Sequence, residues 1–399
     1  MAAAKRARTE SPDGPLSPCQ TPAKAAPSTG TPAAKGPGPS TEYLAQPHCF
    51  DAMSDDSMGQ ARDFLWAHGF AVVRAALDAR ECAEVVDLLW DWLEALGTGI
   101  RRGDPDTWGD DRWPPTIQSG PGLSTGIIPY FGIGQSRAMW RVRANASVRR
   151  AFARIYGVEE GDLISSFDGA SLFRPGCQGP GGWFHVDQHP VRRPGFECVQ
   201  GLVNLLPMSP ATGGNVLVPG SHADFEGLAR RYPDELAEVR EDEDFFGVPE
   251  GDPLFGRAAV MAHLAVGDLL IWDSRTLHCN RSGLPEPTLL CEDPALGSRA
   301  TPRQLPAASC RLLRAAAFVC MVPWSRASRS VLGQRRLAVQ EGLTTAHRPH
   351  VFQSTLDYDH WRRVQRDGLL PKGIHTPRAQ LRRLADMSPV ELSLVGGKA

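Results

Sequence analysis

The sequence lacks three features that would assign it to a membrane, nucleic-acid-binding or disulfide-stabilised class. No apolar run approaches the roughly 18 residues of a membrane-spanning helix, and the amino terminus lacks the apolar core of a signal peptide. The formal net charge is only −2 at pH 7, so no basic excess indicates a nucleic-acid partner. The nine cysteines form no CxxC pair, which favours free thiols in a reducing, cytoplasmic compartment.

Composition divides the 399 residues into one large domain and two tails. Residues 1–42 are rich in Ala, Pro, Gly, Ser and Thr, so we expect a disordered tail. The basic cluster at residues 5–8 is either a weak nuclear-localisation signal or a solvated patch. Residues 43–385 carry enough apolar side chains to form a core, and residues 386–399 are expected to be a flexible C-terminal tail. The oligomeric state is left open.

Helical periodicity and strand-like runs occupy different parts of the predicted domain. The predicted helices cover 61–68, 79–96, 146–156, 335–340 and 377–384. Short apolar runs at 70–73, 163–167, 170–173, 199–206, 215–218, 268–272 and 315–321 are separated by Gly, Pro and Asn turns. Such strands, without strand–helix alternation, are typical of an antiparallel double-sheet barrel. The predicted fold class is therefore mainly β with flanking helices.

Two insertions interrupt this strand pattern close to the residues discussed next. Residues 225–255 are charged and partly helical, and residues 283–309 are rich in proline. Each insertion is either a lid over a site or a surface decoration.

A His-x-Asp pair lies in the Gly- and aromatic-rich segment 183–188. In an extended strand, residues i and i+2 point to the same side, so His185 and Asp187 can bind one metal ion from a single strand end. A third ligand, His278, follows the apolar strand predicted at 268–272. Two imidazoles and one carboxylate form the ligand set suited to non-haem Fe(II). Taken without His278, His185 and Asp187 could instead be two partly buried polar side chains that form local hydrogen bonds and bind no metal.

The order and spacing of several further motifs strengthen the interpretation as a metal site. These motifs cover residues 166–169, 183–188, 213–222 and 267–272, and the strand that ends at 319–323. Over most of residues 60–350 the chain resembles the phytanoyl-CoA dioxygenase family of Fe(II)/2-oxoglutarate oxygenases. The resemblance implies a double-stranded β-helix (jelly-roll, cupin-like) core. It also implies Fe(II) held by His185, Asp187 and His278, with 2-oxoglutarate and O₂ as co-substrates.

A dicarboxylate co-substrate needs a fixed cation, and the planar fork of arginine matches a carboxylate. The family places this arginine on the strand after the distal histidine, which implies Arg314 here, with Arg311 as the competing residue. Asn204 and Asn280 are predicted either to donate hydrogen bonds to the co-substrate or to form internal ones.

Three residues of metal-binding type close to these motifs are assigned other roles. His222 follows a turn and is expected to support the fold rather than bind iron. His189 precedes Pro190, which turns the chain, so we expect it at the pocket rim at most. Cys279, beside His278, is interpreted as a small residue of the pocket wall.

The resulting hypothesis is a dioxygenase that hydroxylates a small organic or lipid-like molecule and releases succinate and CO₂. Because Asp187 retains its carboxylate, no coordination position is left for chloride, which favours hydroxylation over halogenation. Two alternatives remain: a cupin-like metal enzyme that does not use 2-oxoglutarate, and a catalytically silent metal-binding or sensing module. The identity of the substrate, including any use of coenzyme A esters, is left open.

Overall fold

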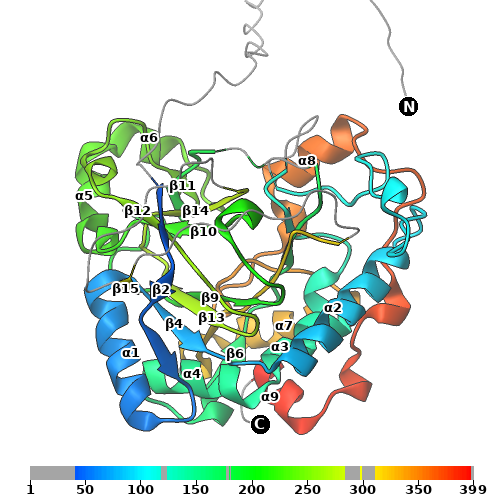
Figure 1. The fold of residues 1–399 in the computed structure, drawn as a ribbon, viewed down its shortest axis with the longest axis horizontal. Helices are drawn as coiled ribbons and strands as arrows, with labels where there is room; N and C mark the ends of the chain where they lie inside the picture. Colours follow the sequence, from blue (N-terminus) through cyan, green and yellow to red (C-terminus); the bar gives the residue numbers. More distant parts are fainter. Residues whose placement is uncertain are drawn as a thin grey trace, which may run out of the picture. The chain divides into compact units, whose positions relative to one another are not determined.

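Two β-sheets form the centre of the fold (Figure 1). The computed structural model describes residues 41–117, 124–176, 179, 181–283, 297–298 and 311–396. The seven-stranded sheet has the order β3 (Cys49–Asp51), β4 (Phe70–Arg74), β13 (Leu269–Asp273), β9 (Val199–Asn204), β16 (Arg314–Phe318), β7 (Ala170–Phe173) and β5 (Ile127–Ile128). The six-stranded sheet has the order β1 (Thr41–Leu44), β12 (Ala259–Ala262), β10 (Gly214–Leu217), β14 (His278–Arg281), β8 (His185–Val186) and β11 (Phe246–Gly247). Most strand pairs are antiparallel, as expected for a jelly roll, whereas β1–β12 and β3–β4 are parallel.

Two strand pairs and several helices complete the fold. The pairs are β2 (Gln46–Pro47) with β15 (Gly297–Ser298), and β6 (Leu163–Ser165) with β17 (Met321–Pro323). The helices are α1 (Asp55–His68), α2 (Ala79–Glu94), α3 (Arg137–Arg143), α4 (Ala146–Tyr156), α5 (Phe225–Arg231), α6 (Pro233–Glu238), α7 (Arg329–Glu341), α8 (Asp359–Arg366) and α9 (Pro389–Gly396). In Figure 1, α5 and α6 lie near β11 and β12, and α2, α3, α7 and α9 gather at the opposite end. No helix among the residues described is long and apolar enough to cross a membrane.

Local sequence signals define the first helices well. Asp78 and Glu81 form a reciprocal capping box at the start of α2, which satisfies two backbone N–H groups that have no helical partner. Helix α1 ends at Gly69, which adopts φ = 82° and donates its N–H to the Leu65 carbonyl. Helix α4 has the bounds predicted for 146–156, with an Asn145 cap and a terminal Gly157.

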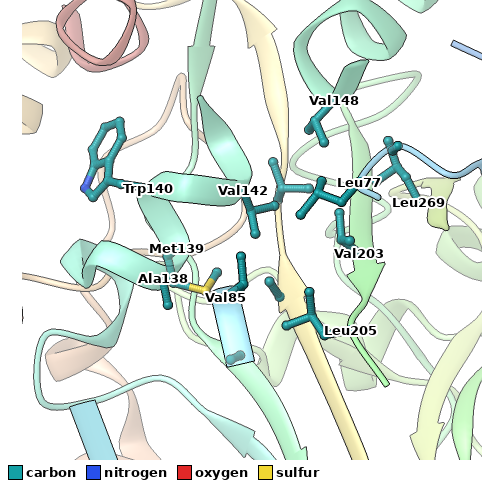
Figure 2. Packing of buried hydrophobic residues seen from close by; sticks show 14 of the residues in the cluster. Leu77, Val85, Ala138, Met139, Trp140, Val142, Val148, Val203, Leu205 and Leu269 are labelled. Atoms are coloured by element: carbon teal, nitrogen blue, oxygen red, sulfur yellow. The ribbon is translucent and has the colours of Figure 1, made fainter. Parts of the chain in front are cut away.

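The seven-stranded sheet is buried on both faces. Side chains of its central strands point alternately to the two faces, and each face belongs to a separate hydrophobic cluster. Val203 and Leu269 face the helices, whereas Leu202 and Leu270 face the six-stranded sheet. Figure 2 shows Val85 and Val142 of the helical layer close to Val203, Leu205 and Leu269. Burial on both faces explains why β13 reads as a continuous apolar run rather than an alternating one.

The structure corrects two predictions about the fold. Helices occupy more of the described chain than strands do, so "mainly β" overstated the strand content. The helix predicted at 377–384 is wrong: the segment forms two single 3₁₀ turns, Arg378–Gln380 and Leu384–Asp386. Between them Leu381 bridges Ser136, and the Arg382 N–H donates to the Gln135 carbonyl at 2.8 Å, so the backbone bonds a neighbouring segment instead of a helical turn.

The ends of the chain differ from the predicted tails where the structure describes them. Residues 386–396, expected to be flexible, include α9, in which Leu394 and Val395 are buried. The buried Arg335 guanidinium donates to the carbonyls of both residues at 2.8 Å, which fixes the helix against α7. Of the tail predicted over 1–42, only Thr41 and Glu42 are described, and they begin β1. The basic cluster at 5–8 lies outside the described residues, as does the insertion 283–309 apart from 283 and 297–298.

Candidate metal centre and cavity

Three predicted metal ligands from two strands meet at one point. His185 and His278 are directly paired across β8 and β14, and Asp187 follows the end of β8. One possible ligand atom from each residue lies within 4.8 Å of the others. The two carboxylate oxygens of Asp187 lie 3.4 Å from His185 Nε2 and 3.3 Å from His278 Nε2. We call these three residues the facial triad.

The backbone fixes which imidazole nitrogen of each histidine faces the metal position. His185 Nδ1 lies 3.0 Å from the Trp183 carbonyl, and His278 Nδ1 lies 2.8 Å from the Thr276 carbonyl. A carbonyl can only accept, so both Nδ1 atoms carry the hydrogen and both Nε2 atoms present a lone pair. Such hydrogen bonds orient metal-binding histidines and raise their basicity.

The protonation states of the facial triad also suit a metal ion. Burial, followed by the nearby His278, lowers the pKa of His185, which keeps the imidazole neutral. Burial alone would raise the pKa of Asp187, but His185 and His347 outweigh this and hold that pKa well below its usual range. Gln200 Nε2 donates to Asp187 Oδ2 at 3.1 Å and orients the carboxylate. Metal ligands must be deprotonated, so the donor set fits Fe(II).

The facial triad lines a cavity of about 410 Å³, within the range of small-molecule sites. Its wall combines apolar side chains with buried polar ones. The apolar part includes Ile117, Ile127, Pro129, Trp183, Phe245, Trp272 and Phe318. The Trp183 ring stacks on His185 at a centroid distance of 4.7 Å and 14° between planes. Trp183 Nε1 also donates to the Asn280 carbonyl at 2.7 Å, which holds the indole in place.

Arg314 lies directly behind this wall. It is 2% exposed, and its Nη1 donates to Asn280 Oδ1 at 2.5 Å and to Ser171 Oγ at 3.3 Å. Asn280 itself lines the cavity and donates to the Thr125 carbonyl and to Ser171. Burial lowers the pKa of Arg314 to about 10, so it remains a cation at neutral pH. No carboxylate of the described part of the chain forms an ion pair with Arg314, and its Nε has no hydrogen-bond partner.

Of the four predicted co-substrate residues only Asn280 lines the cavity, and Arg314 is linked to it through its hydrogen bond to Asn280. Arg311 is exposed, in the segment before β16. Asn204 Nδ2 donates to the carbonyls of Leu206, Leu264 and Ala265, the internal bonding that was its alternative role.

His222 and His189 lie outside the metal position, as expected. His222 Nε2 donates to the Trp66 carbonyl at 3.0 Å. His189 Nε2 donates to the Leu236 carbonyl at 3.1 Å, and its Nδ1 accepts from the N–H groups of Val191 and Arg192. The interpretation of Cys279 as a residue of the pocket wall is wrong, because its side chain is buried in the apolar cluster between the sheets and does not line the cavity.

Two segments outside the sequence motifs line the cavity. Sequence reasoning missed the C-terminal segment 345–363, which contributes Thr345, Ala346, His347, Arg348, Gln353, Thr355, Tyr358, Asp359, His360 and Arg363. The second segment belongs to the 225–255 insertion, which was predicted to be either a lid or a surface decoration, and it contributes Glu243, Asp244 and Phe245. Buried Arg348 forms an ion pair with Asp244, and Arg240 forms one with Asp359, so the two segments are joined. No motif marks either segment, because only the fold brings them to the metal ligands.

Comparisons with known proteins agree with this site. Residues 140–282 match the family model for phytanoyl-CoA dioxygenase (PhyH), and the matched segment includes all of the facial triad. Over this segment the chain is similar to the phytanoyl-CoA dioxygenase family, the same family that its sequence motifs resemble. It is 26% identical over 313 residues to the Ava biosynthesis cluster protein O of Aspergillus versicolor, covering 75% of this chain and 89% of that protein.

Two solved structures are similar at low sequence identity. One is the epimerase SnoN in complex with Fe³⁺, alpha-ketoglutarate and nogalamycin RO, at 16% identity and a TM-score of 0.39, covering 67% of this chain and 84% of that one. The other is the alpha-ketoglutarate-dependent carbocyclase SnoK from nogalamycin biosynthesis, at 12% identity and a TM-score of 0.39, covering 66% of this chain and 83% of that one.

Proposed function

We propose that this protein is an Fe(II)/2-oxoglutarate-dependent dioxygenase that hydroxylates a small organic substrate and releases succinate and CO₂. The observation that carries the proposal is the combination of the facial triad with Arg314. Three ligands of the type that non-haem iron uses stand beside a buried guanidinium that has no carboxylate partner in the described chain. A buried unpaired charge is strongly unfavourable, so a ligand carboxylate is the natural counter-ion.

His185, Asp187 and His278 would hold the iron, since their Nε2 and carboxylate oxygens already face one another. When bound, iron and 2-oxoglutarate supply the oxidation, which is chemistry of the cofactor rather than of the protein. Arg314 would bind the distal carboxylate of 2-oxoglutarate from behind Asn280. Asn280 and Ser171 orient the guanidinium, and arginine presents its donors in a planar fork matched to a carboxylate.

The rest of the chain contributes positioning and exclusion of water. Gln200 fixes the rotation of Asp187, and Trp183 stacks on His185, so two of the ligands cannot reorient freely. Phe245, from the 225–255 insertion, also packs against His185, at a centroid distance of 4.6 Å. The apolar wall around these residues would exclude water beside the metal while the target carbon is held there.

An anaerobic titration tests the proposal directly. Adding Fe(II) and then 2-oxoglutarate to the purified protein should produce the visible charge-transfer band of the chelate. Succinate release with pools of small metabolites and lipids would then identify the substrate, and a mass gain of one oxygen atom would establish hydroxylation. A product of unchanged mass would indicate another reaction on the same co-substrate.

Two outcomes would replace this proposal. Iron binding without the chelate band would support a metal enzyme that does not use 2-oxoglutarate, or a silent binding module. Halogenated product in high chloride would contradict hydroxylation, because a halide would need the coordination position that the carboxylate of Asp187 would occupy. Cytoplasmic localisation stays a prediction from the cysteine pattern.

A further inference from the structure

Asp168 is a buried residue of the cavity wall, and one of its two carboxyl oxygens has no hydrogen-bond partner. The residue follows β6 in the loop that leads to β7, and it lines the same cavity as the facial triad. It is only 8% exposed, yet its Oδ1 has no hydrogen-bond partner. No basic group of the described residues forms an ion pair with it, and the nearby Arg143 bonds its backbone carbonyl instead, at 2.8 Å.

The loop that carries Asp168 is held on every side. The Phe167 N–H donates to Thr345 Oγ1 at 3.2 Å, and the Phe318 N–H donates to the Gly169 carbonyl at 3.2 Å. A Cβ at Gly169 would lie 1.9 Å from the Ile128 carbonyl oxygen, so only glycine allows this approach. Asp168 is therefore fixed before any ligand arrives, as a precise binding site requires.

The electrostatic environment leaves this carboxyl group poorly stabilised when no ligand is bound. Burial raises the pKa of Asp168 to about 7, although Arg143 and Ser166 act in the opposite direction. A buried polar group without a partner is unfavourable, and such groups in native proteins are normally hydrogen-bonded. A ligand that donates a hydrogen bond to this carboxyl group would reduce the penalty.

The surroundings of Asp168 restrict the rest of the ligand. Ile127, Pro129 and Phe318 line the same cavity. The total volume of about 410 Å³ lies near the lower end of small-molecule sites and must also hold 2-oxoglutarate. The enclosed part of the substrate is thus small and largely apolar.

We propose that Asp168 is a specificity-determining residue, which accepts a hydrogen bond from a hydroxyl or ammonium group on a small, largely apolar substrate. The assignment rests on the proposed function, since it places the donor group of the substrate in the cavity of the facial triad. It predicts that alcohols and amines bind in preference to ketones and carboxylates of the same skeleton.

A ligand series with one apolar skeleton tests this assignment. The probes are cyclohexylmethylamine, cyclohexylmethanol, cyclohexyl methyl ketone and cyclohexanecarboxylate. Their dissociation constants are measured by ligand-observed NMR, first on metal-free protein and then on protein loaded with Fe(II) and 2-oxoglutarate without oxygen. The amine and the alcohol should bind at least about tenfold more tightly than the other two, as expected for a hydrogen bond to a charged group. Equal affinities for the four probes would overturn the assignment.

Asp168→Asn assigns the preference to this residue, because it retains the size of the side chain and removes its negative charge. The variant should lose most of the preference for the amine and leave the affinity for the ketone within about twofold. Asp359→Asn is the matched control, because Asp359 lines the same cavity but already forms an ion pair with Arg240. The control should keep the preference, and a preference that survives in Asp168→Asn or disappears only in Asp359→Asn would refute the role.

The outcome is separable from the proposed function. Affinities for Fe(II) and 2-oxoglutarate should be the same in Asp168→Asn and in the unmodified protein, since Asp168 is not among their ligands. If the unmodified protein does not bind 2-oxoglutarate, the proposed function fails, but the four-probe series on metal-free protein still tests Asp168. If Asp168→Asn does not fold, the series is repeated on Asp168→Ala, which also removes the carboxylate and should lose the same preference.

Discussion

Replacing Arg314 by alanine should abolish 2-oxoglutarate binding while leaving the iron site intact. The guanidinium is 2% exposed, holds two side-chain hydrogen bonds and has no carboxylate partner in the part of the chain described. Removing one partner of a buried charge pair costs about 3–5 kcal/mol. Each 1.4 kcal/mol is a factor of ten in affinity, so we expect the dissociation constant to rise by about two to three and a half orders of magnitude.

The assay is an anaerobic 2-oxoglutarate titration of the Fe(II)-loaded protein, followed by the charge-transfer band. Arg311→Ala is the matched control on the same stretch of chain, and its exposed side chain should change the dissociation constant by about twofold at most. Arg314→Lys retains the charge but loses the planar fork, so its affinity should fall between those of the unmodified protein and Arg314→Ala. Iron content and thermal unfolding of each variant show whether the site survives.

Two results would refute this reasoning. A larger effect from Arg311→Ala than from Arg314→Ala would mean that the exposed residue binds the co-substrate. Normal 2-oxoglutarate affinity in Arg314→Ala, together with weak affinity in Asn280→Ala, would mean that Asn280 makes the contact itself and that Arg314 serves only to position it.

Three further predictions follow from other parts of the site. Alanine at any single position of the facial triad should abolish stoichiometric iron, measured by metal analysis, with unchanged circular dichroism; retention of iron by all three variants would contradict the assignment. The pKa of Asp168 is about 7 in the folded chain and near 4 in the unfolded chain, so between pH 4 and pH 7 the folded state binds more protons than the unfolded state. The free energy of unfolding therefore falls as the pH rises from about 4 to about 7. The ligand-free Asp168→Asn variant should therefore gain about 2 kcal/mol relative to the unmodified protein between pH 5 and pH 8 in denaturant unfolding, and a pH-independent difference would oppose this. Asp244→Asn should lower the unfolding free energy by about 3 kcal/mol, because it leaves the buried Arg348 without its carboxylate; an unchanged unfolding midpoint would show that the ion pair is not stabilising.

The amino-acid sequence by itself determined the features that depend on short-range spacing. The i, i+2 relation placed His185 and Asp187 on one side of a strand, and the apolar run at 268–272 identified the strand that precedes His278. Helical periodicity gave the positions of α2 and α4, and the structure adds the Asp78 and Gly157 caps, which satisfy backbone groups only a few residues away.

Tertiary structure alone decided the features that depend on which distant segments meet. Arg314 and Arg311 are equivalent in the sequence, but only the pairing of β16 with β7 buries Arg314 against Ser171 and Asn280. No local sequence pattern marks the segment 345–363 or Asp168 as part of the cavity wall. Long-range hydrogen bonds, such as that from the Phe167 N–H to Thr345 Oγ1, bring them there. Contacts between residues far apart in the chain leave no periodic pattern in the sequence. The residues proposed to contact the substrate can therefore be identified only from the folded structure.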